Sequence, residues 1–274
     1  MLRSTLTKRL DDAAIDYLKR RSRRARGHLR DRIPDVDLLA AEYLHQEHLD
    51  DGERSILSAV DGITLVNPLG LHALVQAVDY VVEREIPGAF VECGTYRGGC
   101  AMAVAMRLVQ LGATDREIHL FDTFEGMPPP ARPDDQLTYL SDGQSIGELF
   151  EDARSDEAKS AAWFSDVETI ARDNVLGTGF PAERLHLVRG KVEDTIPDHA
   201  PASIAVLRLD TDWYESTIHE LEHLYPRLSS NGVLVVDDYG VLEGARDATD
   251  EYFAEHGSVL LHRINFAVRQ AIKP

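Results

Sequence analysis

The chain is poor in cysteine, in aromatic side chains and in positive charge. The shortages of cysteine and of positive charge each exclude a class of protein. Among 274 residues there are 2 cysteines, and aromatic residues make up 7%. A disulfide scaffold is therefore excluded, and we expect Cys93 and Cys100 to be small buried apolar side chains in a reducing compartment. Lysine and arginine number 29 against 47 aspartates and glutamates, a net charge of −18. Non-specific binding to nucleic acid or to an anionic membrane needs cationic groups, so we expect neither partner.

Long apolar segments are also missing. No apolar run reaches the roughly 18 residues of a membrane-spanning helix. The basic N-terminus lacks the apolar core and the cleavage site of a secretory signal. We therefore expect a cytoplasmic protein. Its length suits one elaborated domain, which we place at residues 63–274, after a charged helical extension at residues 1–62 that suits a homodimer contact.

From Gly88 onward, short apolar runs alternate with helical patterns. This alternation predicts an α/β fold with a doubly wound, mostly parallel sheet. The last run, VLLHRINFAVRQ, predicts an antiparallel hairpin at the C-terminal end. Residues 127–162 are polar, turn-rich and too long for an ordinary connection, which is typical of a lid-like insertion at the active edge.

Two pairs of aspartates follow two of the apolar runs. Asp210 and Asp212 come after IAVLRL, and Asp237 and Asp238 come after GVLVV. Such runs, rich in β-branched residues, are typical of strands buried on both faces of a parallel sheet. Residues 214–228 have the length and spacing of a helix. The right-handed crossover of this βαβ unit leaves the two strands close together, with both acidic pairs at their carboxyl ends.

This edge of an open α/β sheet is where ligands bind. Four carboxylates would repel one another there unless a cation lay among them. Oxygen-only ligands favour Mg²⁺, with Mn²⁺ or Ca²⁺ as alternatives, over zinc. A single aspartate pair often only caps a helix or turn. Two pairs on one βαβ unit favour a metal site.

The first strand-to-helix turn, VECGTYRGG, suggests a second ligand. Glu92 ends the strand, and Gly94, Gly98 and Gly99 let a ligand approach the backbone. Asp122 closes the next strand, where a carboxylate can bind both hydroxyls of a ribose. The turn is not a G-x-G-x-x-G fingerprint, and glycines alone are equally typical of a tight βα connection. We interpret the combination as a nucleoside site without a pyrophosphate, for which S-adenosylmethionine is the natural candidate.

The most specific similarity lies in five segments: FVECGTYRGG, LFDTFEGMPPP, GKVEDTIP, the run from AVLRLDTDWYEST to VLVVDDYG, and LHRI. From about residue 63 to 264 the chain resembles the macrocin O-methyltransferase family of antibiotic-sugar methyltransferases, which includes the aminocoumarin-sugar methyltransferases. The resemblance implies a Rossmann-like, class I methyltransferase fold that binds S-adenosylmethionine. It also implies that Mg²⁺ chelates neighbouring hydroxyls of the substrate, a sugar in a small-molecule glycoside.

The resemblance assigns roles to individual residues. Asp212 matches the general base. The metal ligands are matched by Asp210, Asp237 and Asp238. The cofactor contacts are matched by Glu92, Gly94, Tyr96, Gly98, Asp122 and Thr123. The chain departs from the family pattern at Thr211 and Trp213, in the length of its insertion and at its C-terminus. These departures leave the acceptor unidentified.

Other functions remain open. Asp210, Thr211 and Asp212 also form the Asp-x-Asp pattern of metal-dependent glycosyltransferases, although the second aspartate pair argues against it. A phenolic catechol is an alternative acceptor. A non-catalytic binding module would leave the converging carboxylates without a purpose.

Four histidines are not interpreted as functional residues. HELEH, at residues 219–223, satisfies the H-E-x-x-H pattern of zinc proteases. Helical spacing puts His219 and His223 opposite the apolar face of their helix, so we expect both in solvent. His186 and His262 lie within strand patterns, and we interpret them as structural residues.

Overall fold

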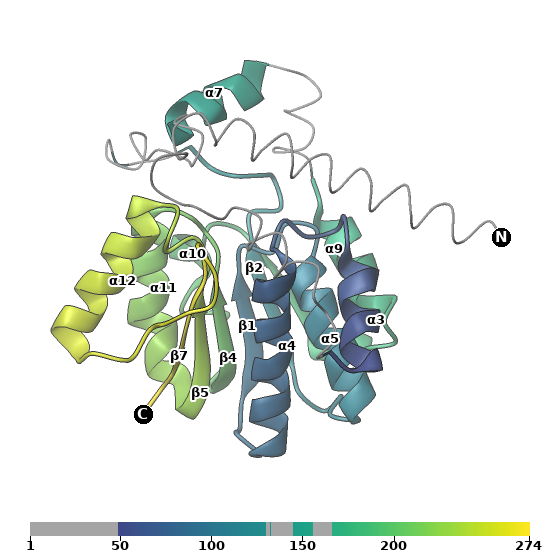
Figure 1. Ribbon diagram of the computed structural model, residues 1–274. Helices are drawn as coiled ribbons and strands as arrows, with labels where there is room; N and C mark the ends of the chain where they lie inside the picture. Colours follow the sequence, from purple (N-terminus) through teal and green to yellow (C-terminus); the bar gives the residue numbers. More distant parts are fainter. Residues whose placement is uncertain (1–48, 130–131, 133–144, 156–165) are drawn as a thin grey trace, which may run out of the picture. The chain divides into compact units, whose positions relative to one another are not determined.

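The computed structural model describes residues 49–129, 132, 145–155 and 166–274. A 7-stranded sheet crosses this part of the chain in the order β3-β2-β1-β4-β5-β7-β6 (Figure 1). Its strands are β1 (Ala89–Cys93), β2 (Ile118–Asp122), β3 (Leu185–Arg189), β4 (Ile204–Leu209), β5 (Leu228–Val236), β6 (His262–Arg263) and β7 (Arg269–Ile272). The first five pair in parallel, and β7 pairs antiparallel with β5 and β6. The predicted fold class is confirmed.

Helices pack on both faces of the sheet. One face carries α3 (Asp51–Val60), α4 (Pro68–Glu83) and α5 (Gly99–Leu111), with α9 (Glu168–Leu176) beside α5. The other carries α10 (Val192–Thr195), α11 (Tyr214–Leu224) and α12 (Glu243–His256). Side chains alternate along each strand, so successive residues enter opposite cores. In β1, Phe90 packs with the first helix layer and Val91 with the second.

The helix predicted at residues 214–228 is shorter than expected. α11 ends at Leu224, a 3-10 turn η2 (Tyr225–Arg227) follows, and β5 begins at Leu228. Pro226 has no N–H to continue the α-helical hydrogen bonds, which explains the early end. The strands on either side of α11 are adjacent and parallel, as predicted.

The N-terminal and insertion predictions fall largely outside the described residues. Residues 1–48 are not among them, whereas α3 packs Ile56 and Val60 into the same core as α4 and α5. α7 (Ile146–Ser155) is the described helix of the 127–162 insertion, and the 3-10 turn η1 (Ala182–Arg184) lies after it, directly before β3. The domain boundary at residue 62 and the lid stay predictions. None of the described helices is long and apolar enough to span a membrane.

Candidate active site

The four predicted aspartates meet at the carboxyl edge of the sheet. The N–H of Asp210 donates to the Cys93 carbonyl at 2.9 Å, and the N–H of Asp237 donates to the Leu209 carbonyl at 2.9 Å. These bonds extend the strand ladders to the acidic residues. Carboxylate oxygens of Asp210, Asp237 and Asp238 all lie within 4.8 Å of one another. The Asp212 carboxyl shares a hydrogen bond with Asp238, so the structure brings all four together.

A buried arginine, which the sequence analysis missed, lies at the base of this group. Arg208 is the register partner of Glu92 across β1 and β4, and its side chain is 3% exposed. Its Nη1 lies 3.1 Å from Glu92 Oε1 and 2.8 Å from Asp210 Oδ2. Its Nη2 donates to Asp237. An arginine inside the apolar run IAVLRL is the signal that was available, because a buried charge requires partners.

The carboxylates still outnumber the guanidinium, and their proton affinities show the imbalance. Burial raises the pKa of Glu92 to about 7, although Arg208 opposes the shift. Burial, followed by the charge of Asp210, raises the pKa of Asp212 to about 7. Burial and the charge of Asp237 raise the pKa of Asp238 well above its ordinary value. A divalent cation would offset this repulsion.

The donor set suits a hard cation. Asp210 and Asp237 each use an oxygen to bind Arg208, but a carboxylate oxygen has two lone pairs and can also bind a metal. Asp238 completes an oxygen-only group. Mg²⁺, Mn²⁺ and Ca²⁺ prefer such ligands. The residues present therefore fit the predicted ion.

Two of the aspartates have unusual backbone conformations. The φ angle is 72° at Asp212 and 51° at Asp238, in the left-handed region that non-glycine residues seldom occupy. Around Asp212 the Trp213 N–H donates to the Thr211 carbonyl at 2.8 Å, which closes a γ-turn. Buried Trp213 also donates through Nε1 to the Pro128 carbonyl at 3.0 Å. Such strain persists only where the surroundings enforce it, and it clusters at functional sites.

Asp122, the predicted ribose ligand, also holds the first turn. Its Oδ2 accepts the N–H groups of Thr95 at 2.6 Å and Tyr96 at 2.8 Å. Its Oδ1 accepts the N–H of Phe124 at 2.6 Å and lies 3.5 Å from the Thr123 hydroxyl. The predicted cofactor residues Asp122, Thr123 and Tyr96 therefore meet at one turn.

The glycines of that turn make room for protein atoms. A Cβ on Gly94 would lie 1.9 Å from the Asp210 carbonyl oxygen, and one on Gly98 would lie 3.0 Å from the Ala171 Cα. Their φ angles are 82° and 77°. Glycine is thus required at position 94 because β1 passes so close to Asp210. Contact of either glycine with a cofactor stays a prediction.

The histidines of HELEH are not in solvent, so that expectation was wrong. His219 and His223 are half-buried, and each has a ring nitrogen 3.0 Å from a carbonyl oxygen, of Ile196 and His219 respectively. The cause is α10, which packs against this side of α11. Glu220 between them is fully buried and accepts a hydrogen bond from the Thr211 hydroxyl at 2.9 Å. A zinc-protease site is not formed by these residues.

The known proteins that this chain resembles in sequence are O-methyltransferases. The family model described as Macrocin-O-methyltransferase (TylF) matches residues 6–264. The 8-demethyl-8-(2,3-dimethoxy-alpha-L-rhamnosyl)-tetracenomycin-C 4'-O-methyltransferase of Streptomyces olivaceus is 31% identical over 194 residues, covering 71% of this chain and 69% of the relative. The demethyldecarbamoylnovobiocin O-methyltransferase of Streptomyces niveus is 29% identical over 197 residues, covering 70% and 68%.

Solved structures agree with these matches. The O-methyltransferase NovP superposes with a TM-score of 0.65 at 28% identity, over 77% of this chain and 82% of that chain. The calicheamicin methyltransferase CalS11 superposes with a TM-score of 0.51 at 20% identity, over 92% and 91%. The second likeness is one of fold.

Proposed function

Since the chain belongs to the macrocin-O-methyltransferase family, we propose that it methylates a sugar hydroxyl of a glycosylated natural product, using S-adenosylmethionine and Mg²⁺. Family membership, the class I methyltransferase fold and O-methyltransferase activity, all predicted from the sequence, are confirmed. The sugar acceptor follows from relatives such as the Streptomyces olivaceus enzyme, whose name includes a rhamnosyl group.

One observation carries the metal-dependent part of the proposal. Asp210, Asp237 and Asp238 offer converging oxygens, and Asp212 lies beside them with a pKa of about 7. When bound there, Mg²⁺ would lower the pKa of a coordinated hydroxyl and fix the attacking oxygen. A glycosyltransferase is supported by the Asp-x-Asp pattern alone.

Asp212 is proposed as the general base. Methyl transfer is an in-line displacement, so the protein must position the acceptor and remove its proton. A base is most effective when its pKa lies near the working pH, and in the metal-free site burial raises the pKa of Asp212 to about 7. The γ-turn at Asp212 holds the carboxyl beside Asp238, and Trp213 anchors the turn by its contact with Pro128.

The cofactor assignments rest on the first turn. Asp122 and the turn that it holds supply hydrogen-bonding groups at the carboxyl ends of β1 and β2, where ligands of open α/β sheets bind. We assign the nucleoside of S-adenosylmethionine to this turn.

A homodimer through the charged N-terminal region is part of the proposal, and that region lies outside the described residues.

Turnover measured against Mg²⁺ concentration tests the roles, with EDTA-treated enzyme as the zero point. We expect Asp237→Asn to lose activity that excess Mg²⁺ partly restores, since an amide oxygen remains a weak ligand. We expect Asp212→Asn to lose activity by about 10²–10⁴-fold without rescue, since an amide cannot accept the proton. Asp247→Asn, an exposed change on α12, is the matched control. Full activity in EDTA would refute the metal mechanism, and rescue of Asp212→Asn by Mg²⁺ would refute the base.

A further inference from the structure

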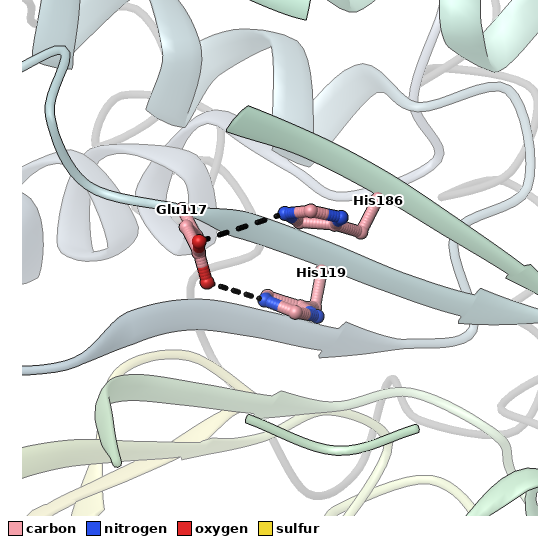
Figure 2. Close-up of side chains that lie close together, drawn as sticks. All are labelled: Glu117, His119 and His186. Carbon is pink, nitrogen blue, oxygen red and sulfur yellow. Dashed lines mark hydrogen bonds and ion pairs between the residues drawn. The ribbon is translucent and has the colours of Figure 1, made fainter. Parts of the chain in front are cut away.

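A second group of titratable side chains lies at the opposite, amino end of the sheet. Glu117 immediately precedes β2, His119 lies within β2, and His186 is its register partner on β3. Residues 117 and 119 face the same side of the sheet as His186, because side chains alternate along a strand and register partners share a face. Figure 2 shows the two imidazole rings one above the other, with the Glu117 carboxylate at their edges. Their centroids are 4.4 Å apart.

Both rings direct Nε2 toward the same carboxylate. His119 Nε2 lies 3.1 Å from Glu117 Oε2, and His186 Nε2 lies 3.8 Å from Glu117 Oε1 (Figure 2). The second distance is too long for a hydrogen bond. Buried His186 Nε2 has no hydrogen-bond partner among the residues that the structure describes. A buried polar atom without a partner is costly, and a bound cation would use its lone pair.

The protonation states suit a metal. Burial lowers the pKa of His119, and the hydrogen bond with His119 lowers the pKa of Glu117. Near neutral pH the group therefore offers a neutral imidazole and an ionised carboxylate. Metal ligands must be free of protons in this way.

We propose that Glu117, His119 and His186 bind a divalent transition metal such as Zn²⁺, which links the edge strand β3 to β2. Two imidazole nitrogens and one carboxylate are ligands typical of zinc and unlike those of Mg²⁺. Tetrahedral zinc with bonds of about 2.0–2.1 Å separates its ligand atoms by roughly 3.3 Å. The three ligand atoms here lie within 4.8 Å of one another, so small side-chain rotations suffice.

Two features limit the affinity. Arg184 Nη1 lies 3.7 Å from Glu117 Oε1 and repels a cation there. His119 Nδ1 is buried without a hydrogen-bond partner within the described ranges, whereas zinc-binding histidines usually donate this second N–H. We therefore expect micromolar rather than nanomolar binding.

The ion has a route from solvent, because Glu117 lines a groove of about 740 Å³ at this end of the sheet.

Zinc titration calorimetry on the EDTA-treated, dialysed full chain tests the proposal, with millimolar Mg²⁺ present to fill the acidic site. We expect one equivalent of zinc to bind with micromolar affinity. His186→Gln and Glu117→Gln should each weaken binding by at least about tenfold, since loss of even an outer-shell partner typically costs that much. His262→Gln, an exposed histidine in β6, should bind zinc like the wild type. Asp237→Asn should do the same, which separates this site from the proposed active site.

Cobalt gives a second readout that does not depend on activity. Co²⁺ should produce visible absorption bands of a tetrahedral histidine site in the wild type and in His262→Gln, and these should be lost in His186→Gln. The side chains of His186 and Glu117 are 40% and 41% exposed, so both variants should fold, as circular dichroism can check. Equal zinc affinity in wild type, His186→Gln and Glu117→Gln would overturn the proposal. Absence of micromolar zinc binding by the wild type would also overturn it.

Discussion

The carboxyl and amino ends of this sheet hold their charged groups in different ways. At the carboxyl ends of β1, β4 and β5, carboxylates surround a single guanidinium, that of Arg208, which is 3% exposed. At the amino ends of β2 and β3, two histidines share one carboxylate, and His186 and Glu117 are 40% and 41% exposed. Solvent therefore screens His186 and Glu117 in the second group, although His119 is buried, whereas the first group depends on an internal cation.

The contrast explains which metal each end suits. Buried carboxylates with raised pKa values gain most from a hard dication. Its two positive charges neutralise carboxylates that would otherwise have to bind protons. The histidine pair carries little charge to neutralise and instead offers nitrogen lone pairs. Chemically distinct sites can therefore lie at the two ends of one sheet.

The largest expected effect tests the dependence on Arg208. Arg208→Met leaves Glu92 and Asp237 buried without their cation, which should destabilise the protein by about 3–5 kcal/mol. The loss should be smaller at pH 5 than at pH 8, since Glu92, with a pKa of about 7, is then protonated. Urea denaturation measures both values. Arg189→Met, which removes an exposed arginine paired with Asp166, should have only a small effect. Equal effects of the two substitutions would contradict the comparison.

Glu220 is the next test, because it is buried near the acidic group without an arginine among its contacts. Burial raises its pKa from 4.5 to about 8. A carboxyl with a raised pKa binds more protons in the folded state than in the unfolded state. Its contribution to stability is therefore complete below pH 4.5 and is lost as the pH rises through about 8.

Glu220→Gln should remove this loss, and the part of it that falls between pH 5.5 and pH 8 amounts to on the order of 3 kcal/mol. The variant should gain stability relative to the wild type between pH 5.5 and pH 8.5, roughly the window set by the raised pKa. Urea unfolding in EDTA at both pH values measures the gain. Glu222→Gln changes an exposed residue of the same helix and serves as the control. A pH dependence identical in wild type and Glu220→Gln would show that Glu220 is ionised in the fold.

The sequence predicted the sheet and its acidic edge because both depend on local patterns. Apolar runs mark the strands, and aspartates that follow β4 and β5 must meet where those strands are neighbours. Arg208 was missed because its partner Glu92 comes from another strand. The γ-turn at Asp212 was missed because one hydrogen bond across a single residue leaves no periodic signal.

The amino-end group was hidden for a related reason. Nothing near His119 in the sequence indicates that it faces His186, because this contact exists only through the pairing of β2 with β3. The pattern of strands predicted that His186 lies in a sheet. It did not predict the order of the strands, on which the group depends.

A moderate effect on cofactor binding is expected at the carboxyl end of β2, where Asp122 lies. Asp122→Ala should weaken binding of S-adenosylhomocysteine by about tenfold or more, on the order of 1.5–3 kcal/mol, because charge-assisted hydrogen bonds are lost. Asp122 also holds the N–H groups of Thr95 and Tyr96, so the turn should loosen as well. Asp115→Ala, an exposed aspartate before the amino end of β2, should leave binding unchanged. Calorimetry distinguishes the two, and unchanged binding by Asp122→Ala would remove Asp122 from the cofactor site.

The smallest effect is expected at the amino end in metal-free protein. In EDTA, His186→Gln should change the free energy of unfolding by less than about 0.5 kcal/mol, as is usual for partly exposed positions. His186 lies on an edge strand and is 3.8 Å from Glu117, too far for a hydrogen bond, so its removal leaves no new buried charge. Urea denaturation of His186→Gln beside Arg208→Met makes the comparison directly. A loss at His186 as large as that at Arg208 would mean that the histidine pair supports the fold without any metal. The two ends would then differ in their chemistry but not in how much the fold depends on them.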